Sequence, residues 1–212
     1  MCKNVLKQLM TMLFIVVALS SVNAQVHVGD ILCEDNSVIS SSQFALSSDK
    51  AIGVVFYVDA TKHHGWAVAL DNEGSLSWGP NYVSTSAPDR TSEQQAIADV
   101  DGFGNTQKIL THSAPSGPYY PAFDTLDFSN GWYLPALGQL KKLYNNLVKV
   151  NESLNVAGGT TFSTEEGEYW SSTEYSSSSS WFMDSTGKSH YKDTTYNGTK
   201  DGRRLVRGVR SF

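Results

Sequence analysis

The fold is decided by two apolar runs, A-I-G-V-V-F-Y-V at residues 51–58 and G-W-A-V-A-L at residues 65–70. The first run is unbroken and has the length of a strand, which favours a strand buried on both faces. The polar segment 59–64 separates it from the second run, as a turn would. Together they predict a β-hairpin through the centre of a sheet.

Further strands are predicted on either side of this hairpin. Towards the N-terminus, residues 25–33 and 37–40 flank the turn-rich Glu34-Asp35-Asn36, which is a hairpin signal. Towards the C-terminus, strand candidates lie at residues 168–173, 180–185 and 205–212. Five consecutive serines at 176–180 are typical of a flexible turn.

Helices are predicted between these groups of strands. Ser92 is a good N-cap for a short helix, the segment 99–105 interrupts it, and residues 106–112 resume helix. A stronger helix begins at Pro135 and ends before Gly158-Gly159. Its apolar residues recur at steps of three and four: Leu137, Leu140, Leu143, Tyr144, Leu147 and Val150. Strands, one or two helices and long loops predict an α+β domain.

Composition excludes several classes of protein. The chain of 212 residues is 40% hydrophobic, which is enough to build a core, and one domain or at most two small ones are expected at this length. Only 17% of its residues are charged and the net charge is −5. This balance excludes a coiled coil, a charge-driven disordered chain and a basic nucleic-acid binder.

The first 24 residues are predicted to be an export signal. Lys3 and Lys7 precede an apolar run from Leu9 to Leu19, and Val22-Asn23-Ala24 offers small residues for cleavage. The run is too short for a membrane span. We therefore expect residues 25–212 to form one domain that is periplasmic, at the cell surface or secreted. Without the signal, the chain has 14 basic and 21 acidic residues, and Cys33 is its single cysteine, so no internal disulfide can form.

Enzyme and cofactor motifs are absent from the sequence. It contains no nucleophile elbow, phosphate-binding loop, dinucleotide fingerprint or zinc-protease motif. Cys33 in a strand pattern is typical of a small core residue rather than a nucleophile. We expect no catalytic residue and no cofactor.

Metal binding is not expected either. If Asp99 opened a twelve-residue calcium loop, Phe103 and Leu110 would occupy positions that need oxygen ligands, so a structural turn explains this stretch better. His63 and His64 adjoin in a predicted turn, where histidines are usually solvated. Glu165, Glu166 and Glu168 are typical of a charged loop, although a carboxylate pair for glycoside chemistry is the alternative.

Four arginines gather near the C-terminus: Arg203, Arg204, Arg207 and Arg210. They could form a phosphate or sulfate site. The simpler interpretation is that they pair with nearby acids while their stems pack on apolar neighbours.

Several short sequence motifs, in their order along the chain, resemble those of the C-terminal domain family of the Legionella collagen-like adhesin. This family is abundant in exported Bacteroidetes proteins. The motifs are Gly131-Trp132-Tyr133-Leu134-Pro135, Tyr169-Trp170-Ser171-Ser172-Thr173-Glu174 and Val206–Phe212, with weaker support from Val28–Leu32 and 51–70. The resemblance implies a C-type lectin-like fold, that is, a twisted antiparallel sheet with one or two flanking helices and long loops. It also implies that Trp132 and Trp170 are buried.

Departures from this pattern limit what the resemblance implies. The formylglycine-generating enzymes of the same fold use a cysteine pair, which a chain starting at Gln25 lacks. The calcium-binding words of sugar-binding lectins are also absent. Neither the oxidase activity nor calcium-dependent sugar binding is therefore expected.

The function predicted from these observations is an exported, non-enzymatic binding or adhesion domain. Its partner would be a glycan or a cell-surface macromolecule, bound without calcium. The alternative is a structural cell-envelope protein that assembles with itself or with a partner protein. A third interpretation is a carbohydrate-active enzyme that uses carboxylates from Glu165 to Glu174.

The binding surface is predicted between Thr173 and Arg203, where tyrosine, serine, histidine and asparagine are frequent. In a strand at 180–185, Trp181 and Met183 would face inward and Phe182 and Asp184 outward. Aromatic rings on loops contact ligands at low entropic cost. The candidate ligand-binding residues are Tyr175, Phe182, His190, Tyr191 and Tyr196. The alternative is that these rings only pack down the loops.

Overall fold

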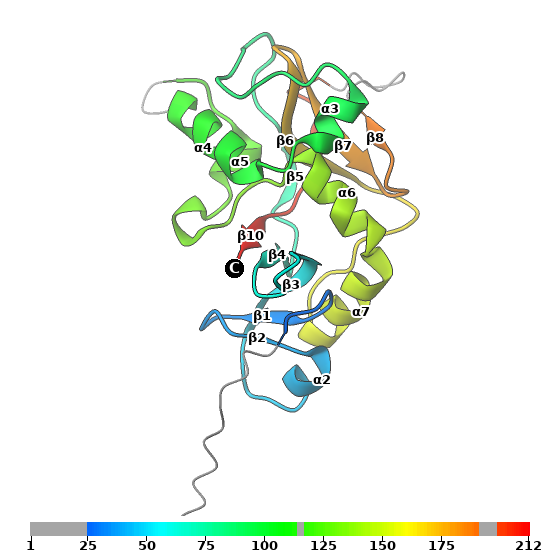
Figure 1. The fold of residues 1–212 in the computed structure, drawn as a ribbon. Helices are drawn as coiled ribbons and strands as arrows, with labels where there is room; N and C mark the ends of the chain where they lie inside the picture. The colour runs from blue at the N-terminus through cyan, green and yellow to red at the C-terminus, as the bar shows by residue number, and fades with distance from the viewer. Residues whose placement is uncertain (1–24, 114–116, 191–198) are drawn as a thin grey trace, which may run out of the picture.

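The computed structural model describes residues 25–113, 117–190 and 199–212, and its fold is mixed α+β as predicted (Figure 1). It differs from the expected single sheet, because the strands form two five-stranded sheets with several helices around them. The predicted signal segment 1–24, Tyr191 and Tyr196 lie outside the described residues.

The first sheet contains the predicted central hairpin. Its strand order is β10-β4-β3-β1-β2, and all its pairs are antiparallel. The strands are β1 (Ile31–Cys33), β2 (Val38–Ile39), β3 (Ala51–Val58), β4 (Gly65–Ala69) and β10 (Val209–Ser211). The β1–β2 hairpin confirms the predicted N-terminal pair, although its strands are shorter than expected. In β3, the residues from Gly53 to Phe56 are buried, in agreement with the apolar run.

The second sheet has the order β5-β9-β6-β7-β8. Its strands are β5 (Gly74–Ser77), β6 (Glu168–Ser176), β7 (Ser179–Asp184), β8 (Ser189–His190) and β9 (Arg203–Val206). The β6–β9 pair is parallel and the other pairs are antiparallel, so the sheet is mixed. The serine run at 176–180 spans the tight turn between β6 and β7, with Ser176 in β6 and Ser179 and Ser180 in β7.

The C-terminal residues belong to both sheets, which corrects the prediction of one strand at 205–212. β9 ends at Val206 in the second sheet, and β10 begins at Val209 in the first. Between them, the Arg207 side chain turns back to donate from Nε to the Ala69 carbonyl at 2.8 Å. This short crossover links the two sheets covalently at their C-terminal strands.

The helices are α2 (Ser41–Phe44), α3 (Glu93–Ala98), α4 (Gly102–Ser113), α5 (Pro121–Asp124), the 3-10 turn η1 (Phe128–Asn130), α6 (Leu137–Asn145) and α7 (Leu147–Ala157). The Ser92 side chain caps α3 as predicted by accepting from Gln95 N. The predicted helix from Pro135 is two helices, because the chain bends at Asn146, whose side chain donates to the Phe56 carbonyl at 3.1 Å. Gly158, in the left-handed region at φ 75°, ends α7.

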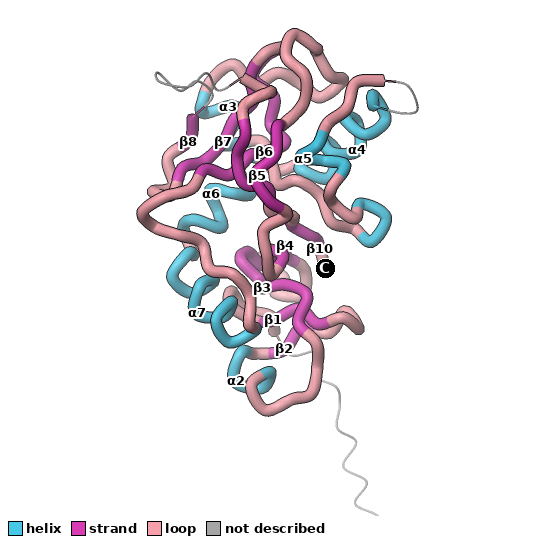
Figure 2. Tube along the Cα trace, turned by 180° about the vertical axis from the view of Figure 1, so that it is seen from behind, coloured by secondary structure: helices cyan, strands magenta, loops and turns pink. Residues whose placement is uncertain are grey.

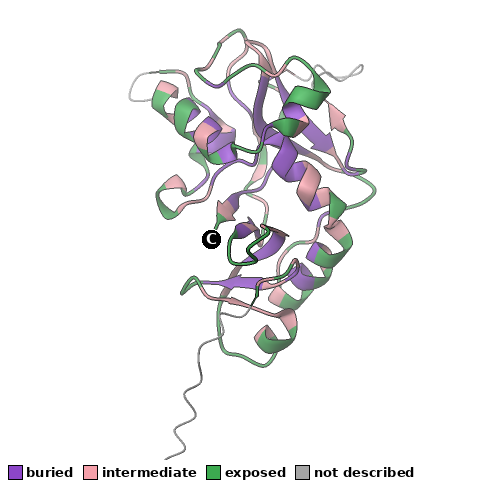
Figure 3. Ribbon diagram, viewed as in Figure 1, coloured by how far each residue is buried: buried purple, intermediate pink, exposed green. Residues whose placement is uncertain are grey.

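Two clusters of buried apolar side chains hold these layers together. Figure 3 shows the buried residues of the sheets and helices in purple. The main core joins residues of both sheets, such as Val54, Phe56 and Trp181, to the apolar stripes of α6 and α7. The second core lies on the other side of the second sheet, where α4 and α5 are placed (Figure 2). It contains Trp78, Trp170, Phe182 and Phe123 among others. The second sheet is therefore covered on both faces.

Burial of the two predicted core tryptophans differs. Trp170 is 1% exposed, as expected, whereas Trp132 is only half-buried. Cys33 is 1% exposed and free, which confirms its prediction as a core residue. None of the helices in the described part of the chain has the length and apolar content that a membrane span requires.

Candidate functional site

Phe182, which was predicted to face outward, is 1% exposed, so this part of the predicted binding patch is wrong. Trp181 and Met183 do face the main core, and Phe182 points to the opposite face as strand geometry requires. That opposite face is the second core rather than solvent, where Phe182 packs edge-on against Trp170 with ring centroids 5.9 Å apart.

The remaining described members of the predicted patch are partly covered. Tyr175 is half-buried and packs edge-on against Trp181, with ring centroids 5.9 Å apart. His190 of β8 stacks on Phe182 of β7 at 5.4 Å. The structure thus brings Phe182 and His190 together, but as a packed pair. Tyr191 and Tyr196 lie outside the described residues.

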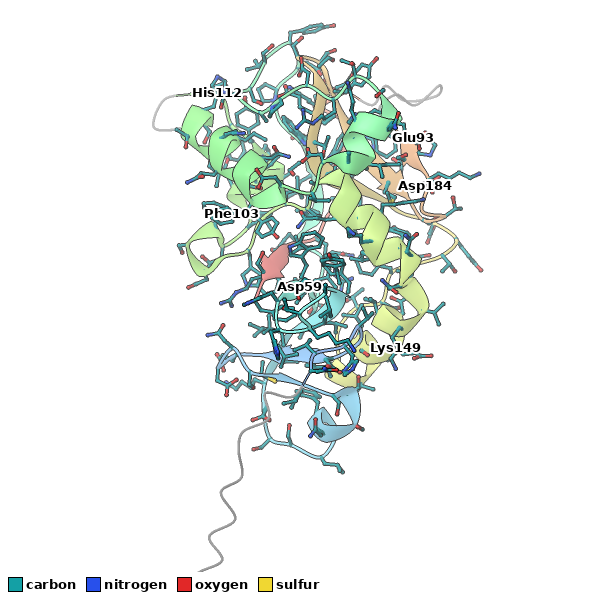
Figure 4. The ribbon with its side chains drawn as sticks, in the orientation of Figure 1. Asp59, Glu93, Phe103, His112, Lys149 and Asp184 are labelled. Atoms are coloured by element: carbon teal, nitrogen blue, oxygen red, sulfur yellow. The ribbon has the colours of Figure 1, made fainter. Side chains whose placement is uncertain are left out.

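Polar contacts fix this packed pair. Nε2 of His190 lies 2.9 Å from Oδ2 of Asp184 (labelled in Figure 4), and the Arg204 guanidinium lies 3.6 Å from the centroid of the Phe182 ring. Burial opposes ionisation of Asp184, but hydrogen bonds from Thr186, His190 and the Lys188 backbone outweigh it and lower its pKa to about 2. Arg204 also pairs with Glu168 at 2.8 Å, which confirms the expected pairing and packing for this arginine.

The loop between β5 and α3 forms a second candidate surface, because a buried ion pair holds it in place. This loop, residues 79–90, runs over the end of the second sheet (top of Figure 1) and is called the clamped loop below. Glu174 of β6 and Lys200 form an ion pair with both side chains fully buried. Lys200 Nζ also donates to the Val83 carbonyl at 2.8 Å, and Glu174 accepts from the Thr85 hydroxyl. The buried pair therefore holds the middle of the loop through hydrogen bonds.

The two ends of the clamped loop are also tied to this centre. Gly79 N donates to the Lys200 carbonyl at 3.0 Å, and Arg90 N donates to the Glu174 carbonyl at 2.8 Å. Trp181 Nε1 donates to the Arg90 carbonyl at 2.7 Å. Burial lowers the pKa of Lys200, while Glu174 opposes this shift. An irregular segment is thereby held at several separate points.

Two tyrosines, one on this loop and one near it, are exposed to solvent. Tyr82 is 85% exposed and adopts a left-handed backbone at φ 59°, which is unfavourable for a residue with a bulky side chain. Tyr119 is 69% exposed, and its neighbour Tyr120 packs directly against Gly79 at the start of the clamped loop. Two exposed aromatic rings thus emerge from adjoining loops, where they are available for contact with a ligand or partner.

Sequence reasoning did not identify this surface. Gly79-Pro80-Asn81-Tyr82 carries a turn signal but no sign of exposure. The clamp joins Glu174 to Lys200, which are 26 positions apart, so no local pattern reveals it.

The residues that the sequence offered as catalytic or metal-binding candidates have the following surroundings in the described part of the chain. Within them, no group of three His, Cys, Asp or Glu side chains is placed to hold a metal ion. Asp99 accepts from Asn105 Nδ2 at 2.9 Å and from Thr173 Oγ1 at 3.0 Å, as a structural turn would. Glu165 and Glu166 are exposed in a turn, and burial raises the pKa of Cys33, which favours its thiol form.

Comparisons with known proteins identify a fold but no family. No family model matches the chain, and no curated protein matches it. Among solved structures, a fimbrial protein from Bacteroides ovatus is similar with a TM-score of 0.68 and 18% identity. The likeness covers 88% of this chain and 49% of that protein, so the chain spans about half the length of its structural neighbour.

This result corrects the resemblance drawn from the sequence words. The words around Trp132 and Trp170 resembled the Legionella collagen-like adhesin family, but no family model matches and the similar structure is a fimbrial protein. The C-type lectin-like fold that the resemblance implied is therefore withdrawn. At 18% identity, what the comparison establishes is that this chain shares the fold of half of the Bacteroides ovatus fimbrial protein.

Proposed function

We propose that this chain is an exported cell-surface protein that assembles with copies of itself or with a partner protein. The observation that supports this proposal is the fold shared with a fimbrial protein over 88% of the chain. The predicted export signal and the mildly acidic composition are compatible with such a location. We further propose that the chain has no catalytic activity and acts through its contacts.

Fractionation of the native host tests this proposal. Cells would be treated with an external protease, and their surface structures would be removed by mechanical shearing. We expect the chain to be digested on intact cells and to appear in the sheared fraction within assemblies much larger than the 23.2 kDa of the full 212-residue chain. A chain that resists digestion on intact cells and sediments as a monomer in all fractions would contradict the proposal.

A second candidate function is recognition of a glycan or another surface macromolecule. The exposure of Tyr82 on the clamped loop, and of Tyr119 on another loop, favours it, because tyrosines supply contact area at low entropic cost. Tyr191 and Tyr196 from the predicted patch stay candidates for the same role. This function could coexist with assembly.

Binding to a glycan array, compared between matched variants, tests the second candidate. Tyr82→Ala and Tyr119→Ala are expected to weaken any glycan signal at least tenfold without lowering the melting temperature. Leu46→Ala is the control, because Leu46 is 91% exposed on another part of the chain, after α2. Equal loss in all three variants, or no signal for the parent protein, would argue against glycan recognition by these tyrosines.

A further inference from the structure

A surface pocket of 760 Å³ lies where the β1–β2 turn, the β3–β4 loop and β10 meet. This volume is within the range of small-molecule sites. Its lining is Val26, Asn36, Val38, His63, His64, Arg210, Ser211 and Phe212. Apolar walls, neutral polar groups and basic side chains thus meet in one place, and none of the lining side chains is an acid.

Among the described salt bridges, Arg204 is the one member of the C-terminal arginine group that pairs with an acid, and Arg210 is the member that lines the pocket. Arg204 pairs with Glu168, and Arg207 donates to the backbone carbonyls of Ala69 and Leu70. By contrast, Arg210 donates from Nη2 to the neutral Asn36 Oδ1 at 2.7 Å. In the described part of the chain no carboxylate oxygen lies within 4.0 Å of its guanidinium nitrogens.

The surrounding backbone holds Arg210 in place. It lies in β10, opposite Ala67 of β4. Gly131 at φ 84° lies beside it, and a Cβ at that glycine would stand 3.4 Å from Arg210 Nε. Asn36, which receives its hydrogen bond, has a left-handed backbone at φ 67° in the β1–β2 turn. The guanidinium is therefore positioned before any ligand arrives.

The two histidines come from a loop that is also fixed. Asp59 (labelled in Figure 4) accepts from the backbone N–H groups of Thr61 and Lys62, each at 3.0 Å. The Thr61 hydroxyl in turn accepts from His63 N at 3.3 Å. This turn places His63 and His64, both exposed, at the rim of the pocket. Imidazole rings there can donate hydrogen bonds to an anion.

We propose that this pocket binds a carboxylate-bearing sugar, such as a uronic or sialic acid at the end of a glycan. The planar fork of Arg210 matches a carboxylate in two parallel hydrogen bonds. The Asn36 amide can bond to a sugar hydroxyl, and Phe212, Val26 and Val38 offer surface for the apolar side of a sugar ring. The site is separate from the tyrosines of the clamped loop and does not depend on the proposed assembly.

Calorimetry on the exported protein tests this site with four probes: N-acetylneuraminic acid, galacturonic acid, galactose and inorganic phosphate. We expect at least one acidic sugar to bind, and galactose to bind at least tenfold more weakly. Arg210→Lys keeps the charge but removes the fork, so it should weaken binding of the acidic sugar about tenfold at an unchanged melting temperature. His63→Ala and His64→Ala should each weaken it a few-fold.

Arg203→Gln is the matched control, because Arg203 belongs to the same arginine group but contacts Ser75 outside the pocket. This variant should bind the acidic sugar as the parent does. Three results would overturn the proposal: no binding of either acidic sugar, equal binding of galacturonic acid and galactose, or tighter binding of phosphate than of both acidic sugars. An unchanged affinity in Arg210→Lys would show that the Arg210 guanidinium does not bind the sugar carboxylate through two parallel hydrogen bonds.

Discussion

Glu174 and Lys200 form a buried ion pair. This pair connects β6, the segment around Lys200 and the clamped loop. Their side chains are fully buried, and they bind Val83 and Thr85 of the clamped loop as well as each other. Lys200 Nζ also lies 4.7 Å above the Trp78 ring. A buried charge that loses its partner is strongly unfavourable, whereas removal of both charges costs much less.

Lys200→Met is therefore expected to lower the free energy of unfolding by about 3–5 kcal/mol, because it leaves Glu174 buried without a counter-charge. Adding Glu174→Gln should restore a large part of this loss, since glutamine is neutral and can still accept from Thr85. Urea denaturation measures both values. Lys188→Met, at an exposed lysine, is the control and should change stability by less than about 0.5 kcal/mol. A double variant no more stable than Lys200→Met would contradict this account.

The lowered pKa of Asp184 predicts that the stability of the folded protein decreases at acidic pH. The pKa of Asp184 in the folded protein is about 2, below the ordinary aspartate value of 3.8, so its hydrogen bonds stabilise the fold above about pH 4. This contribution is lost as the pH falls from about 4 to about 2. We expect Asp184→Asn to be less stable than the parent at pH 7 and the difference to shrink towards pH 2. Urea titrations over this range measure it, and a constant difference would be the contrary result.

At the scale of elements, close packing of α3 against α6 depends on a glycine at the first turn of α6. Gly138 N donates to the Asp99 carbonyl at 2.9 Å, so the backbone of α6 touches the end of α3. A Cβ at Gly138 would meet the carbonyl oxygens of Ile97 and Asp99, the latter at 2.5 Å. The two helices can approach this closely only without a side chain there.

Gly138→Ala is expected to destabilise the protein by about 1–3 kcal/mol, because rigid backbone atoms must move to admit the methyl group. Gly104→Ala in α4 is the matched control. The atoms nearest to its Cβ belong to the flexible side chain of Asp101 rather than to backbone, and alanine favours helix over glycine by up to about 1 kcal/mol. Thermal unfolding compares the two variants. A Gly138→Ala protein that melts at or above the parent temperature would refute this close approach.

At the scale of the whole molecule, the two sheets share one core. Val54, Phe56 and Val209 of the first sheet and Trp181 and Met183 of the second belong to the same buried cluster. The chain also passes between the sheets from β4 to β5 and from β9 to β10. Neither sheet can lose its structure without exposing apolar surface of the other.

We therefore expect residues 25–212 to unfold in a single cooperative transition. Tryptophan fluorescence reports mainly on the second sheet, where Trp78, Trp170 and Trp181 are buried, while far-UV circular dichroism reports on all elements. The two signals should follow the same curve in urea. Separate midpoints for fluorescence and circular dichroism would show that the sheets unfold independently.

The sequence alone determined the elements whose signals are local. The central hairpin at 51–70, the Ser92 cap and the glycine that ends α7 at Gly158 were all predicted, because strand runs, caps and left-handed glycines depend on neighbouring residues. Burial of Cys33 followed from the same strand pattern.

Only the tertiary structure decided which faces are buried and which residues meet. The alternation of side chains along β7 correctly placed Trp181 and Phe182 on opposite faces of the sheet. It could not reveal that a second core covers the face on which Phe182 lies. The crossover at Arg207, the Glu174–Lys200 pair and the exposed Tyr82 likewise depend on contacts between residues distant in sequence. Local patterns encode backbone conformation, whereas the candidate surfaces of this protein arise from long-range packing, which no single segment specifies.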